Sequence, residues 1–475
     1  MLFNSIHFLI FFPIVLAVYF IIPRRARYIW LLLASYYFYM SWNAKYALLI
    51  ATSTIVTYLS GMLISITTRQ AVKKTWVFIS FAINLSILAF FKYYDFGYNV
   101  ILPVGISFYT FQALSYTVDV YRKDVEAEKN LFKYALFVSF FPQLVAGPIE
   151  RSKSLVTQIR KCHEIKLFNY ERITEGLALM LWGYFQKMVV ADRVAILVTQ
   201  VYDNYMYYGT VGLVIATLFF SVQIYCDFAS YSNIAVGAAK IMGFDLMENF
   251  STPYLARSIA EFWRRWHISL STWFKDYLYI PMGGSRCGTV RHYFNLMVTF
   301  LVSGLWHGAD WKYVVWGGIH GVYQIIGRMT KKVKMKIYKL CGVNTENFSF
   351  GLMQTAVTFA LVNLAWIFFR AESIEVALII IKRIFTRVDL WNLFNDSIYS
   401  MGLSRREFNI ALFVIGIVVV ADIIKRFVDN NVYHWLKNQG VVFRGLLYIA
   451  AVVMIIVLGI YGPYFNPTQF VYFQF

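Results

Sequence analysis

The residues best suited to chemistry form a run of tryptophans, charged groups and one histidine at positions 261–270. The run reads Glu-Phe-Trp-Arg-Arg-Trp-His-Ile-Ser-Leu, and its histidine, His267, is followed 53 positions later by His320. His320 lies in the apolar segment VVWGGIHG at 314–321, in which it is the one ionisable residue. Ionisable groups at membrane depth cost several kcal/mol unless they face a protein interior or a water-filled cavity, so they indicate a functional site.

Two buried imidazoles suit acyl transfer from a thioester to a hydroxyl. This reaction needs a base for the hydroxyl, and imidazole titrates near neutral pH. A second polar group would orient the acyl donor or stabilise the oxyanion. The plainer alternative makes each histidine a hydrogen-bonded core residue, and it applies to His307 as well. We expect no metal at His267, His307 and His320, because neither an HxxxH spacing nor a second carboxylate accompanies them.

The composition predicts a membrane protein that holds these residues between helices. Hydrophobic residues make up 59% of the chain and charged residues 15%, with a mean hydropathy of +0.56. Several apolar windows reach the roughly 17–25 residues that cross a bilayer. The clear candidates for spans, some of them slightly shorter, lie near 2–22, 28–42, 46–67, 75–91, 101–121, 174–198, 211–226, 290–305, 312–328, 352–369, 408–424 and 445–462.

Two more apolar stretches, near 134–149 and 256–280, carry charge or proline and are expected to be re-entrant or interior helices. The fold class is therefore all-α and polytopic, with about 11–13 transmembrane or re-entrant helices. We expect residues 261–271 to form one of these helices. Within it Glu261 and Arg265 would pair across one turn, and His267 would look into a cavity.

The net charge of +19 is concentrated in short basic loops. They lie at 24–27, 69–74, 122–123 and 331–339, and the positive-inside rule places them in the cytoplasm. The expected partner of this charge is membrane lipid and not nucleic acid. The four cysteines show no CxxC pairing, so the sequence predicts neither zinc nor a disulfide framework.

Four blocks of the sequence resemble the membrane-bound O-acyltransferase (MBOAT) family, particularly the bacterial branch that acetylates cell-surface polysaccharides such as alginate and peptidoglycan. The blocks are PVGISFYTFQ at 103–112 with AGPIER at 146–151, QIYCDFASYS at 223–232, the stretch 261–286, and GLWHG at 304–308 with WGGIHG at 316–321. The resemblance spans about residues 1–330 and reaches the C-terminus with weaker matches.

The resemblance implies a ring of helices around a central tunnel, with two histidines near its waist. His320 matches the histidine regarded in this family as the catalytic base. His267 matches a second polar residue, which is histidine in this branch and asparagine in many eukaryotic relatives. The resemblance also implies cytosolic acyl-CoA, above all acetyl-CoA, as the donor substrate, with no permanently bound cofactor.

Three arginines are candidates for binding the phosphates and the pantetheine arm of coenzyme A. Arg264, Arg265 and Arg286 suit this task, because a guanidinium makes bidentate contacts with phosphate. The alternative is that they form internal ion pairs with Glu261 and Asp276. The complete set expected to bind substrate is Arg264, Arg265, Trp266, Asp276, Arg286, Trp306 and His307.

The aromatic C-terminal tail resembles the FxYFxF ending of this branch. A similar ending occurs in the small partner peptide of the related D-alanylation acyltransferase, where the tyrosine is thought to carry the acyl group. By analogy Tyr472 would be a covalent relay, with His320 as its base, because a phenol with a pKa near 10 needs help to act as a nucleophile. The alternative is that the tail only packs in a groove.

We expect residues 1–475 to form one integral membrane acyltransferase domain in the bacterial cytoplasmic membrane, crossing it several times. Its parts would be an N-terminal helix set (1–150), a catalytic core (173–330), C-terminal helices (351–462) and the tail (463–475). The acetyl group would end on a surface glycan hydroxyl through an extracytoplasmic acetyltransferase with a serine nucleophile. The chain itself shows no extracytoplasmic domain large enough to hold a polymer.

Three alternatives remain open at this point. The first is transfer of D-alanine or another acyl group to a teichoic-type polymer or lipid. The second, from a different class, is a transporter in which the two histidines relay protons, although the repeated halves of many transporters are not visible here. The third is a scaffold that recruits cell-wall enzymes, which would leave the buried histidines without a task.

Overall fold

A computed structural model describes residues 1–93, 103–145, 147–428 and 432–461. Helices are the regular secondary structure throughout this part of the chain, which contains no strand, so the predicted all-α class is confirmed. The chain divides into two compact units. Unit 1 comprises Met1–Tyr184 and Ser230–Glu248, and unit 2 comprises Phe185–Ala229 and the described residues that follow Glu248.

Six helices of the described chain are long and apolar enough to cross a membrane, which confirms the polytopic prediction. They are η2 with α3 (Ala44–Ile66), α4 (Gln70–Tyr93), α11 (Thr210–Met242), α17 (Phe348–Arg370), α19 (Arg405–Phe427) and α21 (Val441–Leu458). Other helices occupy the remaining predicted windows, as α1 (Ile6–Ile21) does near the N-terminus.

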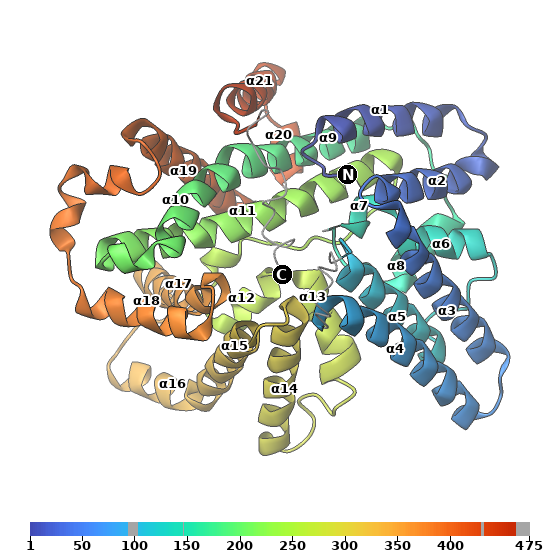
Figure 1. Ribbon diagram of the computed structural model, residues 1–475, viewed down its shortest axis with the longest axis horizontal. Coiled ribbons are helices and arrows are strands. Elements are labelled where there is room, and N and C mark those ends of the chain that lie inside the picture. Colours follow the sequence, from blue (N-terminus) through green and yellow to red (C-terminus); the bar gives the residue numbers. More distant parts are fainter. Residues whose placement is uncertain (94–102, 146, 429–431, 462–475) are drawn as a thin grey trace. The chain divides into compact units, whose positions relative to one another are not determined.

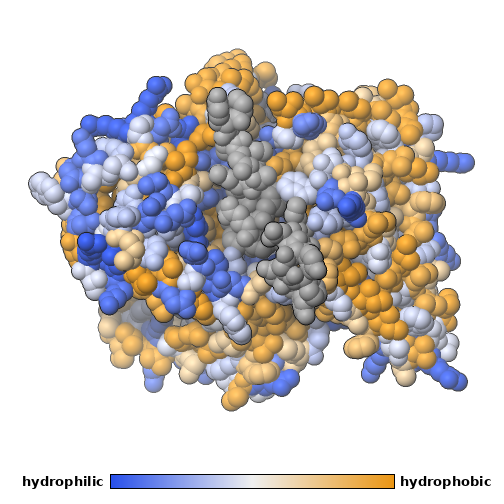
Figure 2. All heavy atoms as spheres, in the orientation of Figure 1, coloured by the Kyte–Doolittle hydropathy of each residue, from blue (hydrophilic) through white to orange (hydrophobic). Residues whose placement is uncertain are grey.

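No side chain of α21 is buried and most are apolar, whereas most of the α11 span is buried. Val441, Leu446 and Ile456 are among the exposed residues, and Figure 2 shows the apolar surface over α21. A continuous exposed apolar surface on a helix is typical of contact with a membrane.

Unit 1 is built around α2 (Arg27–Met40), α3, α5 (Ile106–Arg122) and α6 (Leu131–Ser139). Figure 1 shows α3, α4 and α5 side by side, and the contacts between them agree. Buried polar side chains join these helices, since the Tyr134 hydroxyl donates to Thr57 Oγ1 at 2.7 Å. Hydrogen bonds of this kind satisfy the polar groups that the apolar core would otherwise leave unpaired.

Unit 2 contains a hairpin of α14 (Thr289–His307) and α15 (Trp311–Met329), which lie side by side in Figure 1. Asp310 precedes α15 and caps it, because its side chain accepts from the Lys312 backbone N–H at 2.8 Å. The two backbones touch at small residues. A Cβ atom on Gly317 would lie 2.3 Å from the Phe300 carbonyl oxygen.

We expect Gly317→Ala to destabilise the protein by roughly 1–3 kcal/mol, because the added methyl group must push α14 and α15 apart. The measurement is the midpoint of thermal unfolding of the purified protein in detergent. Gly318→Ala is the matched control, because its Cβ would meet Leu301 at an ordinary distance of 3.5 Å. Equal midpoints for the two variants would show that the helices are not in close backbone contact at Gly317.

The predicted single helix over 261–271 is wrong. Instead α12 (Ile259–Arg265) ends, His267 takes the left-handed conformation with φ of 43°, and α13 (Ile268–Phe274) begins. A distant segment stabilises the break, since the Ile268 N–H donates to the Asn249 carbonyl oxygen at 2.9 Å. The predicted pair of Glu261 and Arg265 does form, within α12 and at 2.9 Å.

The basic stretch at 331–339 is a helix and not the loop that we expected. It forms α16 (Lys331–Leu340), which has no buried residue. Its five lysines are interspersed with apolar residues. Lysine, methionine and leucine have high helix propensity, so a run of this composition favours a helix.

Candidate functional site

His320 lies fully buried in α15 and is bound by a tryptophan of α12. The Trp263 indole N–H donates to His320 Nδ1 at 3.1 Å, and the two rings meet edge to face with centroids 5.1 Å apart. Trp316, one turn earlier in α15, lies 5.2 Å from the imidazole. The orientation of His320 is therefore fixed by a hydrogen bond and by packing.

Both predicted catalytic histidines belong to one series of ring contacts in unit 2. His267 lies 6.0 Å from Trp306, Trp306 lies 4.9 Å from His307, His307 lies 5.1 Å from Trp316, and Trp316 lies 5.2 Å from His320, all between ring centroids. We call these five residues the histidine cluster. The structure thus brings together four residues that the sequence analysis selected, and it adds Trp316.

Further aromatic side chains enclose the histidine cluster. Trp366 stacks on Trp316 at 5.6 Å, and Trp266, predicted to bind substrate, lies 5.1 Å from Trp366. Trp266 is only 1% exposed, so in this structure it is a core residue beside the cluster. Phe228, from the QIYCDFASYS block, packs on His267 at 4.6 Å. Such an apolar surrounding strengthens any electrostatic contact made inside it.

Two nitrogen atoms of the histidine cluster make no hydrogen bond with the described residues. They are His320 Nε2 and Trp316 Nε1, and both side chains are almost completely buried. Buried polar atoms are usually hydrogen-bonded, so each exception calls for an explanation. Hydrogen bonding to a bound substrate would give these atoms the partners that the protein does not.

The three candidate arginines differ in their surroundings. Arg265 pairs with Glu261 and also donates to Thr252 Oγ1 at 3.0 Å, so it makes the internal ion pair that was the alternative to donor binding. Arg264 and Arg286 are exposed, and neither forms an ion pair within the described part of the chain. Their role in binding coenzyme A stays a prediction.

The structure gives little information on the roles of the two remaining predicted residues, Asp276 and Tyr472. Asp276 is half-buried in the π-helical turn Lys275–Tyr279 that follows α13. Tyr472 lies outside the described residues, so its role as a relay stays a prediction.

A buried ion cluster that we did not predict lies in unit 2. Lys187 Nζ contacts Asp227 Oδ1 at 2.6 Å and Asp192 Oδ1 at 2.9 Å, and all three side chains are less than 5% exposed. Lys187 lies in a π-helical turn, Phe185–Ala191, and such turns are frequent near functional sites. Asp227 directly precedes Phe228, so the ion cluster holds the segment that packs on His267.

We expect Lys187→Met to destabilise the protein by about 3–5 kcal/mol, because two buried carboxylates lose their partner. Thermal unfolding in detergent measures this, and adding Asp192→Asn and Asp227→Asn should restore most of the loss. Lys240→Met is the control, since the ion pair of Lys240 with Glu175 is partly exposed and is worth about 1 kcal/mol or less. A Lys187→Met protein as stable as the control would contradict the expectation.

The N-terminal blocks 103–112 and 146–151 have structural contacts in unit 1. Gln143 donates to Gln112 Oε1 at 2.8 Å, and Gln112 donates to a backbone carbonyl at 2.6 Å. Glu150 accepts from the Met247 N–H at 2.6 Å, and burial raises the pKa of this carboxyl to about 7. These contacts are structural and lie in unit 1, whereas the histidine cluster lies in unit 2.

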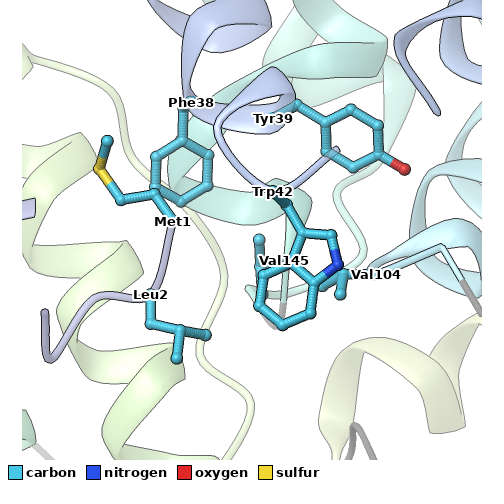
Figure 3. A pocket seen from close by; sticks show the side chains of 7 residues that line it. All are labelled: Met1, Leu2, Phe38, Tyr39, Trp42, Val104 and Val145. Atoms are coloured by element: carbon cyan, nitrogen blue, oxygen red, sulfur yellow. The ribbon is translucent and has the colours of Figure 1, made fainter. Parts of the chain in front are cut away.

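A small pocket in unit 1 is a poor candidate for the reaction. Figure 3 shows its lining, in which Tyr39 and Trp42 supply the polar side-chain atoms. Its volume is about 10 Å³, which is near the minimum for one water molecule. The pocket is lined by Met1, Leu2, Phe38, Tyr39, Trp42, Val104 and Val145. Neither an acyl donor nor a sugar would fit.

Known proteins are similar to most of this chain. Residues 36–342, which include the whole histidine cluster, match the membrane-bound O-acyltransferase family model. A Pseudomonas aeruginosa protein named Probable alginate O-acetylase is 38% identical over 401 residues, covering 79% of this chain and 73% of its own length. A Peptidoglycan O-acetyltransferase of Helicobacter pylori is 34% identical over 429 residues, covering 80% and 79%.

A more distant relative is the Teichoic acid D-alanyltransferase of Bacillus subtilis. It is 28% identical over 265 residues, covering 50% of this chain and 62% of its own length. The family match spans well over half of the present chain, and the two relatives above 30% identity are covered over more than two thirds of their length. With its apolar helices and its buried histidine cluster, the chain belongs to the membrane-bound O-acyltransferase family and is a multi-pass membrane acyltransferase.

Proposed function

We propose that the protein moves an acetyl group from cytosolic acetyl-CoA to hydroxyl groups of an extracytoplasmic cell-surface polysaccharide. The observation that carries this proposal is the histidine cluster, which joins His267 and His320 through ring contacts in one buried aromatic interior. The relatives named for alginate and peptidoglycan acetylation cover about four fifths of the chain, whereas the D-alanyltransferase covers half. An acetyl group is therefore favoured over D-alanine.

The chemistry is transfer of an acyl group from sulfur to oxygen. An acceptor oxygen forms a bond to the carbonyl carbon, the carbon–sulfur bond breaks, and the hydroxyl proton ends on the sulfur of coenzyme A. We assign the movement of this proton and the stabilisation of the oxyanion to His267 and His320. Each such contribution is worth roughly 10²–10⁴ in rate.

The acceptor of the first step is proposed to be Tyr472. Its phenol would become an acetyl ester and would pass the acetyl group to a serine of a partner transferase outside the cell, and from there to the glycan. The resemblance of the ending 468–475 to the FxYFxF pattern supports this step. Arg264 and Arg286 are exposed and are the remaining candidates for the phosphates of coenzyme A.

The location that fits this function is the bacterial cytoplasmic membrane, with a tunnel between the two faces. Six helices of the described chain are long and apolar enough to cross a membrane, which supports the multi-pass part of the proposal. The donor would enter from the cytosol and the acceptor from the opposite face.

Incubation of the protein, reconstituted in lipid vesicles, with labelled acetyl-CoA tests the proposal. We expect intact-mass analysis and peptide mapping to find one acetyl group on Tyr472, and expect His320→Ala to abolish it. Release of free coenzyme A that depends on His320, without label on the chain, would reject the relay and retain the transferase. The absence of both label and coenzyme A release, in the presence of acetylated and deacetylated glycan fragments, would contradict acetyl-CoA as the donor.

A further inference from the structure

The hydrogen bond between Trp263 and His320 determines which imidazole nitrogen carries the proton. An indole N–H is only a donor, so the nitrogen that it contacts must be an acceptor. That nitrogen is His320 Nδ1, at 3.1 Å. A neutral imidazole has one N–H and one acceptor nitrogen, so the hydrogen of His320 is on Nε2.

Packing keeps this arrangement in place. The His320 side chain is fully buried and Trp263 is 8% exposed. Phe262 lies nearly parallel to the imidazole at 6.2 Å, and Trp316 packs edge to face with it at 5.2 Å. Turning the ring over would break the bond to Trp263 and would have to displace these neighbours. The nitrogen left for a substrate is Nε2, which makes no hydrogen bond to the described residues.

We propose that His320 acts as a hydrogen-bond donor through Nε2, to the thioester carbonyl oxygen as it becomes an oxyanion, and that Trp263 is the positioning residue that enforces this role. The inference rests on the proposed function, which it refines. A neutral imidazole N–H can polarise a carbonyl, and a donor of this kind, placed in advance in a dry site, is a large contribution to catalysis.

The proton balance distinguishes this role from that of a base. The acceptor oxygen bonds to the carbonyl carbon and the carbon–sulfur bond breaks, while His320 keeps the hydrogen on Nε2 throughout. The hydroxyl proton goes to a second base and then to the coenzyme A sulfur. His267, in the same histidine cluster, is the other imidazole proposed for the reaction. If His320 were the base at Nε2, its hydrogen would be on Nδ1 and two donors would face each other at 3.1 Å.

Two substitutions at His320 separate a donor from a base. The side-chain amide of His320→Gln supplies an N–H near the position of Nε2 but has no basic nitrogen, and His320→Ala supplies neither. We expect the glutamine variant to transfer acetyl groups at least about tenfold faster than the alanine variant, since one oxyanion donor is worth roughly 10²–10³. Equal loss in the two variants would overturn the proposal.

The positioning role of Trp263 is tested with Trp263→Phe, which removes the indole N–H and keeps an aromatic ring. We expect kcat to fall by about tenfold or more with little change in KM for acetyl-CoA, because the lost bond orders His320 and does not bind the donor. An unchanged kcat would contradict this role.

A spectroscopic measurement determines the position of the proton on His320 directly and does not depend on enzymatic activity. Nitrogen-15 spectra of histidine-labelled protein in lipid, with the His320 signal assigned from its absence in His320→Gln, report which nitrogen is protonated. We expect protonated Nε2 in the wild type and a mixture of tautomers in Trp263→Phe. Protonated Nδ1 in the wild type would overturn the inference even in an active enzyme. Protonated Nε2 in a protein that transfers no acetyl group would instead reject the proposed function.

Discussion

His320→Ala is expected to lower acetyl transfer at least about 100-fold while the protein still folds and inserts in the membrane. The substitution removes the Nε2 atom that the cluster leaves for a substrate, and either a lost donor or a lost proton-transfer group costs that much. The measurement is the initial rate of coenzyme A release and of acetyl transfer in lipid vesicles.

The control for this variant is His163→Ala, which removes an exposed histidine of unit 1. Size-exclusion profiles and unfolding midpoints of both variants should show that the protein is folded. If His320→Ala retained half or more of the wild-type rate, the histidine cluster would not be the active centre and the reaction would have to be sought elsewhere in the chain.

Tyr472→Phe is expected to abolish acetylation of the glycan acceptor, with a loss of about 100-fold or more. Phenylalanine keeps the aromatic ring and removes only the hydroxyl oxygen, which is the proposed nucleophile. The measurement follows labelled acetyl groups from acetyl-CoA to the protein and then to an acceptor supplied together with the partner transferase.

Tyr461→Phe is the matched control, since Tyr461 is an exposed tyrosine just before the tail. Wild-type transfer by Tyr472→Phe would reject the covalent relay and leave a tail that only packs. His320→Ala and Tyr472→Phe are informative together, because coenzyme A release that needs His320 but not Tyr472 would indicate direct transfer to another hydroxyl.

The sequence was sufficient for the all-α membrane fold and for the selection of His267 and His320, because hydropathy and buried charge are local properties of the chain. The break between α12 and α13 could not be predicted in the same way. Residues 261–271 have a pattern that favours one helix, but the Asn249 carbonyl accepts from the Ile268 N–H and the Ser251 N–H donates to the Arg265 carbonyl, where the helix ends. Those partners are distant in sequence and appear only in the folded chain.

Some residues near the site that were not predicted make local contacts, and others make contacts between distant parts of the sequence. Trp316 lies one helical turn before His320, so its contact with the imidazole could have been expected from spacing alone. The bond from Trp263 joins residues 57 positions apart, and no periodicity indicates it. Lys187 lies in the apolar window 174–198, which the sequence analysis treats as a simple transmembrane helix. Its charge, in the same window as Asp192, is a signal for a buried ion pair.

The left-handed backbone of His267 restricts which residues this position accepts. Besides glycine, few residue types tolerate a positive φ, and asparagine and histidine are enriched there several-fold. Those two are the types that the family resemblance pairs at this position. The backbone conformation at position 267 therefore restricts the residue there, in addition to any requirement for side-chain chemistry. An alanine at this position would combine conformational strain with the loss of the imidazole, so asparagine is the substitution that isolates the chemistry of the ring.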